Sequence, residues 1–130
     1  MTSALDIFAP VFAVTDLSQE ERFAVEQIPA DEATTFLRCV YRECKGSPYA
    51  RNLLKDICVS ARSSGATVSE YVRDIITVYA WLDTRHEQAR SVDILEYVRC
   101  AREGSSLQMG HDIKWYLDTY GFEKIANSKI

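Results

Sequence analysis

The stretch TVSEYVRDIITVYAWLD, from Thr67 to Asp83, decides the fold of this 130-residue chain. Its first four residues have the T-x-x-E form of a capping box, in which the two side chains bond to free backbone amides at a helix start. Apolar residues then recur around much of a helical circumference, as is typical of a helix in the centre of a core. The β-branched run Ile75–Val78 favours a strand instead. The capping box and the length of the pattern favour a central helix.

Start signals of the same kind occur along the rest of the chain. Ser18–Glu21 is a second capping box, and the helix that begins there should end before Pro29, because the residue preceding a proline disfavours helical backbone angles. Asp31 can cap the next helix, which is expected to run to about Lys45. Serines precede three further expected helices: Ser47, Ser91, and Ser105 or Ser106.

Glycines indicate where these helices end. Four of the five glycines fall at an expected helix end, whereas Gly110 lies inside the first turn of the last helix. The four are Gly46, Gly65, Gly104 and Gly121. The pattern predicts an all-α fold, a compact single-domain bundle of about five or six short helices.

The two ends of the chain carry weaker signals. Residues 4–14, around Pro10, are apolar without a clear period, so they can form a short helix, a strand or an arm. Within a single domain of residues 1–130, we therefore treat 1–16 as a candidate arm and 122–130 as a candidate flexible tail.

The composition is that of an ordinary globular protein, with 47% hydrophobic and 26% charged residues. No apolar run approaches the roughly 20 residues that cross a bilayer. The first basic residue is Arg22, so the N-terminus does not resemble a secretory signal. We therefore expect a cytoplasmic protein with no membrane partner.

Charge is unevenly distributed along the chain. Residues 1–33 carry seven acidic side chains and one basic side chain, Arg22, although the net charge of the whole chain is only −4. Either an acidic arm folds back on a basic face, or the protein has two differently charged surfaces. The second interpretation assumes less about the fold and is favoured.

The cysteines and histidines show no spacing that suggests chemistry. The four cysteines contain no CxxC pair and lie among apolar residues, so we expect free, reduced and mostly buried thiols. Cys39 and Cys44 are five residues apart, which places them on different faces of a helix and makes a poor metal chelate. His86 and His111 are each followed by an acid, but adjacent helical residues point about 100° apart and form no ready acid–base pair.

Sequence motifs for catalysis or cofactor binding are also missing. The chain has no GxGxxG, no GxxxxGK[ST], no HExxH and no EF-hand loop. We therefore expect no catalytic residue, no cofactor and no metal ion, and we expect that the protein is not an enzyme.

Aromatic residues suggest where a partner could bind. Trp115 and Tyr120 should lie away from the inner stripe of the last helix, and exposed Trp and Tyr are favoured at protein interfaces. Apolar residues at both ends of the chain extend this set. The candidate partner-binding residues are Trp115, Tyr120, Phe122, Phe8 and Phe12. They lead us to expect a protein partner or self-association.

A short basic stripe offers an alternative. Arg38, Arg42 and Lys45 are spaced by four and three residues, which stacks them on one edge of a helix. If these side chains only face solvent, the stripe is an ordinary feature of a helix surface. As a phosphate-binding stripe it would bind nucleic acid in a salt-dependent way.

Residues 64–76, SGATVSEYVRDII, resemble the turn and second helix of ribbon-helix-helix DNA-binding proteins, with residues 50–63 as the first helix. The resemblance implies a dimer that reads the major groove with a strand from each chain. That strand would be Thr35–Arg42, with Arg38, Val40 and Arg42 facing the bases. Residues 31–44, however, fit a helix better.

Taken whole, the chain resembles the small tail assembly chaperones of long-tailed phages. The resemblance lies in length, acidic charge and helix pattern, from LSQEER (Leu17–Arg22) onward. It implies a cytoplasmic, non-catalytic helical protein that escorts the tape-measure protein during tail assembly. Because the resemblance is one of overall profile, no functional residue is carried over from it.

Overall fold

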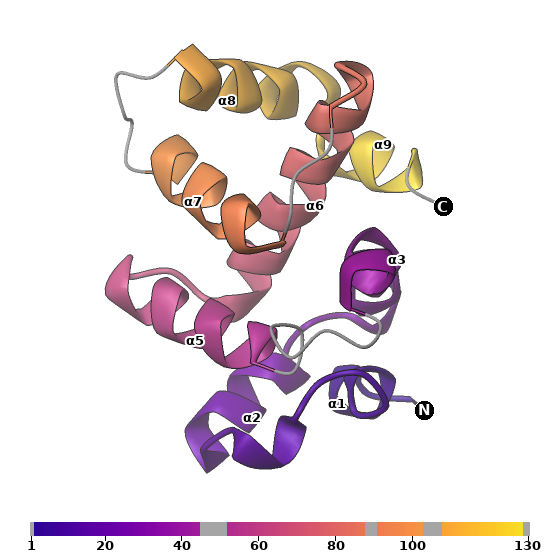
Figure 1. The fold of residues 1–130 in the computed structure, drawn as a ribbon, viewed down its shortest axis with the longest axis vertical. Helices are drawn as coiled ribbons and strands as arrows, with labels where there is room; N and C mark the ends of the chain where they lie inside the picture. Colours follow the sequence, from indigo (N-terminus) through magenta and orange to yellow (C-terminus); the bar gives the residue numbers. More distant parts are fainter. Residues whose placement is uncertain (1, 45–51, 88–90, 103–107, 129–130) are drawn as a thin grey trace.

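The computed structural model describes residues 2–44, 52–87, 91–102 and 108–128, and within these ranges the chain is all-α (Figure 1). This confirms the predicted fold class. The elements in order are α1 (Ala4–Phe8), the 3₁₀ turn η1 (Val14–Asp16), α2 (Gln19–Glu26), α3 (Ala30–Cys44), α5 (Leu53–Ser63), α6 (Val68–Thr84), α7 (Ser91–Arg102), α8 (Gln108–Tyr120) and α9 (Phe122–Asn127). The described ranges thus contain eight α-helices, more than the five or six expected. The helices α1 and α9 have only five and six residues, too few to show a helical period in the sequence.

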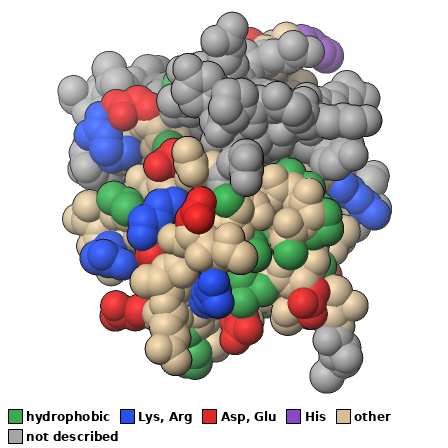
Figure 2. All heavy atoms as spheres, turned by 60° about the horizontal axis from the view of Figure 1, so that its bottom comes forward, with side chains coloured by type: hydrophobic (Ala, Val, Ile, Leu, Met, Phe, Trp, Pro, Cys, Tyr) green, Lys and Arg blue, Asp and Glu red, His purple; other side chains and the backbone are tan. Residues whose placement is uncertain are grey.

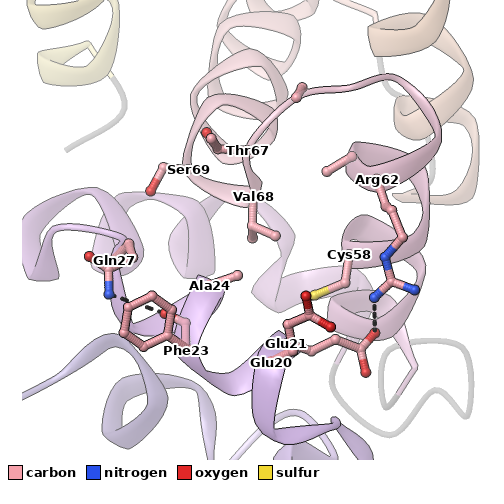
Figure 3. Close-up of a pocket in the computed structure, with 12 residues that line it drawn as sticks. Glu20, Glu21, Phe23, Ala24, Gln27, Cys58, Arg62, Thr67, Val68 and Ser69 are labelled. Carbon is pink, nitrogen blue, oxygen red and sulfur yellow. Dashed lines mark hydrogen bonds and ion pairs between the residues drawn. The ribbon is translucent and has the colours of Figure 1, made fainter.

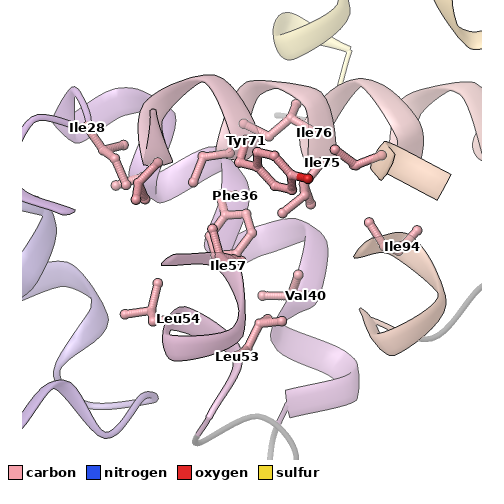
Figure 4. Packing of buried hydrophobic residues seen from close by; sticks show 14 of the residues in the cluster. Ile28, Phe36, Val40, Leu53, Leu54, Ile57, Tyr71, Ile75, Ile76 and Ile94 are labelled. Atoms are coloured by element: carbon pink, nitrogen blue, oxygen red, sulfur yellow. The ribbon is translucent and has the colours of Figure 1, made fainter. Parts of the chain in front are cut away.

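Helix α6 is the centre of the core, as the sequence predicts, and packs against α2, α3, α5, α7, α8 and α9. The Thr67 hydroxyl accepts from the Glu70 amide at 3.1 Å, and the Glu70 carboxylate accepts from the Thr67 amide at 3.3 Å. The β-branched run is helical, and Thr77 donates its hydroxyl to the Arg73 carbonyl at 2.9 Å. Figure 4 shows side chains of α3, α5 and α7, such as Phe36, Ile57 and Ile94, gathered along α6.

Charged side chains also connect α6 to its neighbours. Arg102 on α7 donates to Asp74 at 2.6 Å and to Glu70 at 3.3 Å, and Arg73 donates to Glu32 on α3 at 2.8 Å. Burial raises the pKa of Asp74 despite the neighbouring Arg102 guanidinium. These pairs join segments about 30 to 40 residues apart in the sequence, so they help to hold α3 and α7 against α6.

The N-terminal segment is helical and packed rather than an arm. Helix α1 contacts α2 and α3, and its Phe8 ring lies 5.6 Å from Phe36 and 5.5 Å from Phe12, both in edge-to-face geometry. Phe8 and Phe12 are buried. The segment shows no period in the sequence because one and a half helical turns are too short to reveal it.

The C-terminal segment is also helical where it is described. Helix α9 packs on α6 and α8 and buries Ile125. Residues 122–127 of the candidate flexible tail therefore form a packed helix. Residues 129 and 130 lie outside the described part. Gly121, with φ of +79°, makes the turn between α8 and α9.

Two further glycines have identifiable structural roles. Gly65, with φ of +67°, follows the end of α5, as expected. Gly110 lies inside α8, where a Cβ atom would stand 3.1 Å from the Cys100 carbonyl oxygen of α7. Gly110, the glycine that did not fall at an expected helix end, therefore lies where α7 and α8 approach each other closely. The expected signals at Gly46, Ser47, Gly104, Ser105 and Ser106 lie outside the described residues.

The strand that the ribbon-helix-helix alternative requires is contradicted, because residues 35–42 belong to helix α3. Thr35 donates its hydroxyl to the Asp31 carbonyl at 3.0 Å, and Val40, which would have faced the bases, is buried. Apolar residues at helical spacing outweigh the local strand preference here. Arg38 is exposed, whereas the Arg42 side chain and Lys45 lie outside the described part.

Among the helices within the described ranges, none is both long and apolar enough to traverse a bilayer.

Candidate functional site

Two exposed rings on α8 form the core of the first candidate site. Trp115 is 62% exposed and Tyr120 is 45% exposed. Their ring centroids lie 6.3 Å apart with the planes nearly perpendicular, and Tyr116 lies 5.2 Å from Tyr120. Edge-to-face geometry of this kind stabilises aromatic pairs. We call Trp115, Tyr116 and Tyr120, with Trp81 and Arg85 of the α6 end, the α8 aromatic surface.

The α8 aromatic surface is concave. Its residues line a hollow of about 290 Å³ together with Thr84 and Asp112. The Arg85 guanidinium carbon lies 5.0 Å from the centroid of the buried Trp81 ring, and the Lys124 ammonium nitrogen lies 5.4 Å from the Tyr120 centroid. The site therefore combines exposed aromatic faces with two cations that already contact rings.

The helical period accounts for the exposure of Trp115 but not for that of Tyr120. Ile113 is buried against the core, and Tyr116, three residues later, is half-buried. Trp115 follows Ile113 by two residues, which places it about 200° around the helix and toward solvent. Trp115 is exposed, as expected from that position, whereas Tyr120 follows Ile113 by seven residues, on the same side of the helix, and is exposed at the last residue of α8.

The other three predicted partner-binding residues do not join this surface. Phe122 is half-buried beneath Arg73, whose guanidinium carbon lies 4.4 Å from its ring centroid. Phe8 and Phe12 are buried with Phe36, and this corrects the expectation that they lie on the surface. Their burial follows from helix α1, one of the three conformations left open for this stretch, which turns the apolar opening residues toward α3.

A second concave surface lies between α2, α5 and the start of α6 (Figure 3). This α2–α5–α6 hollow has a volume of about 490 Å³. Its apolar lining comes from all three segments: Phe23, Ala24, Cys58, Ala61, Ala66 and Val68. Phe23 is 66% exposed, an unusual position for a phenylalanine ring. The sequence analysis did not identify this surface.

A buried carboxylate forms part of the wall of the α2–α5–α6 hollow. Glu21 is only 2% exposed, and its Oε1 atom accepts from the Ser18 amide at 2.8 Å and from the Lys55 ammonium at 2.6 Å. Burial opposes ionisation, but the bonds from Lys55 and Ser18 outweigh it and hold the pKa of Glu21 below its usual range. Glu21 therefore stays ionised at neutral pH.

Two polar atoms at this hollow make no hydrogen bond within the described part of the chain. They are Glu21 Oε2, which is 3.9 Å from an Arg62 nitrogen, and the Ser69 hydroxyl oxygen. Buried polar atoms are usually hydrogen-bonded. Both atoms lie beneath the surface, so within the described residues the wall of the hollow contains two unsatisfied polar groups.

The thiol at the hollow is not an activated nucleophile. Burial and the nearby Glu21 carboxylate raise the pKa of Cys58 to about 11. A thiol with such a pKa is protonated at neutral pH, and the thiolate is the reactive form. Elsewhere in the described ranges, no group of three or more His, Cys, Asp or Glu side chains is arranged to hold a metal ion.

One signal in the sequence could have indicated the second surface. The Ser18–Glu21 capping box sets the register of α2, and Val25 follows Glu21 by one turn on the buried face. Phe23 lies between them, about 200° from each, and so must face outward. The hollow beside it depends on α5 and α6, which no local pattern places there.

With these two surfaces defined, comparison with known proteins adds no relative: the chain matches no protein-family model, no curated protein and no solved structure.

Proposed function

We propose that this protein is a non-catalytic helical assembly protein that binds a protein partner through the α8 aromatic surface. The observation that carries the proposal is the pair of exposed rings Trp115 and Tyr120, which pack edge to face beside a hollow. Trp and Tyr are the residues most enriched at the energetic centres of protein interfaces.

The physical argument concerns the cost of binding. Aromatic side chains offer a large contact area with only two rotatable bonds, so little conformational entropy is lost when a partner covers them. The Trp115 ring is further restrained by Tyr120, and Tyr120 by Tyr116 and Lys124. A surface that is rigid before binding loses less freedom in the complex.

A narrower form of the proposal is a cytoplasmic tail assembly chaperone that escorts a phage tape-measure protein. It is supported by the length, acidic charge and helical composition of the chain. An escort must cover apolar segments of its client, for which a preformed aromatic surface is suited. This form predicts that co-expression increases the soluble yield of a tape-measure segment and that Trp115→Ala abolishes the increase.

The binding test compares the tagged protein with its Trp115→Ala variant in the native host. A partner should co-purify with the unaltered chain, and isothermal titration of that purified partner should show at least tenfold weaker binding to Trp115→Ala. Val59→Ala is the matched control, since Val59 is an apolar residue on α5 that is 47% exposed. Equal affinity of all three proteins would refute the assignment of the surface.

A further inference from the structure

The α2–α5–α6 hollow and a projecting aromatic ring lie side by side on one face. Phe23 stands at the rim of the hollow, 66% exposed, on the α2 helix that also forms one wall. Figure 2, which turns the α1 and α2 end of the molecule forward, shows apolar patches interspersed with side chains of both charges. A projection and a depression within the same patch are what a two-fold symmetric contact needs, because each copy must supply both.

We propose that this face is a self-association surface, on which Phe23 of one copy inserts into the α2–α5–α6 hollow of a second copy and the reverse. The inference goes beyond the proposed function, because it concerns a different surface and a different partner from the α8 aromatic surface.

The size of the hollow permits this insertion. Its volume of about 490 Å³ lies in the range that holds whole small-molecule ligands, so it accommodates one phenyl ring. The lining side chains Ala24, Ala61 and Val68 are apolar and short or branched, and they leave the space open. Insertion would remove from water both the exposed Phe23 ring and this lining, which favours association.

The charges around the hollow suit a second copy. The rim carries both signs, with Glu20 on α2 and Arg62 on α5, both exposed. In a two-fold arrangement the acidic helix of one copy faces the basic helix of the other, so opposite charges meet twice. A patch of a single sign would instead repel its own copy.

The first test measures molecular mass by light scattering over a range of protein concentrations. The unaltered chain should approach twice its monomer mass of 14.8 kDa. Phe23→Ala should raise the dimer dissociation constant at least tenfold, because two ring insertions are lost, and Phe23→Glu should give monomers. Circular dichroism verifies folding, which substitution of this exposed ring should leave intact. Val59→Glu is the control for an added charge at another exposed apolar position.

The second test locates the contact. Phe23 is replaced by the photoreactive residue p-benzoylphenylalanine, and equal amounts of ¹⁵N-labelled and unlabelled protein are mixed before irradiation. The expected result is cross-linked peptides between labelled and unlabelled chains that join position 23 to the segment around Ala61 or Val68. The same residue at position 59 should give no such link.

Three results would overturn the proposal. The first is a monomer mass at every concentration for the unaltered chain. The second is a dimer that persists in Phe23→Glu but is lost in Trp115→Ala, which would assign self-association to the α8 aromatic surface. The third is cross-linking from position 23 only within single chains. The first and third results leave the binding of a different protein at α8 untouched. The second moves self-association to α8, and titration of the purified partner then decides the proposed function separately.

Discussion

At the scale of single residues, Glu21 shows how one side chain serves two purposes. In the sequence it is the last residue of a capping box, and the structure confirms that role through its bond to the Ser18 amide. It is also buried and paired with Lys55, 34 residues away, so it fixes α2 against α5. The first role was predictable from four adjacent residues, whereas the second depends on a distant contact that no local pattern contains.

The charge of Glu21 predicts a specific pH dependence of stability. Because its folded-state pKa is lowered, its ionised form stabilises the native state at neutral pH, and this contribution is lost as pH falls through the folded-state pKa. Glu21→Gln should therefore lower the free energy of unfolding by about 1–3 kcal/mol at pH 7. The difference between the two proteins should shrink as pH falls below about 4.3, the usual glutamate value.

Urea unfolding at several pH values measures this difference. Asp74, whose raised pKa acts in the opposite direction, is present in both proteins and cancels in the comparison. Glu20→Gln is the control, since Glu20 is the exposed neighbour of Glu21 and should change stability by no more than about 0.5 kcal/mol. A constant difference between Glu21→Gln and the unaltered protein from pH 7 to pH 3 would contradict the assigned role of the charge.

At the scale of helices, strong boundary signals predicted the elements that carry them. The capping boxes at Ser18 and Thr67 begin α2 and α6 as expected. Helix α1 was left open between a short helix, a strand and an arm, although Ser3 and Asp6 form a capping box there, and α9 was expected as a tail. Five or six residues are too few to display a helical period. For the same reason Phe8 was expected on the surface, although α1 turns it into the core. Trp115 was placed correctly because Ile113 and its neighbours define the buried side of a longer helix.

The close approach of α7 and α8 at Gly110 predicts the effect of a larger residue. Leucine is a far better helix former than glycine, so on propensity alone Gly110→Leu should stabilise α8. A Cβ atom there would stand 3.1 Å from the Cys100 carbonyl oxygen, and a leucine side chain needs still more room. We expect overpacking to prevail and to lower the free energy of unfolding by about 1–3 kcal/mol.

Thermal and urea unfolding check this expectation. The control is His111→Leu, which places the same side chain at the adjacent exposed position of α8 and should be nearly neutral. A Gly110→Leu protein as stable as the unaltered chain would mean that α7 and α8 separate easily. Their contact would then not be a fixed part of the core.

At the scale of the whole molecule, the two surfaces lie at opposite ends of α6. The α8 aromatic surface is formed by α8 and the C-terminal end of α6, and the α2–α5–α6 hollow by α2, α5 and the N-terminal end of α6. The sequence could predict the exposed Trp115 of the first surface, although the hollow there also needs Trp81 and Arg85 of α6. It could not predict the second, since a hollow exists only once three helices are placed around it. The two proposals together imply that the chain can pair with its own copy and still present α8 to another protein.

The most direct test of the proposed function measures the environment of Trp115 in the complex. The chain has two tryptophans, and Trp81 is buried, so the difference between the unaltered protein and Trp115→Phe isolates the exposed ring. Acrylamide quenching of fluorescence is recorded with and without the partner purified from the host. If the partner covers the α8 aromatic surface, the Trp115 emission moves to shorter wavelength and its quenching falls severalfold. A partner that binds while the emission and quenching of Trp115 stay unchanged would place the interface elsewhere.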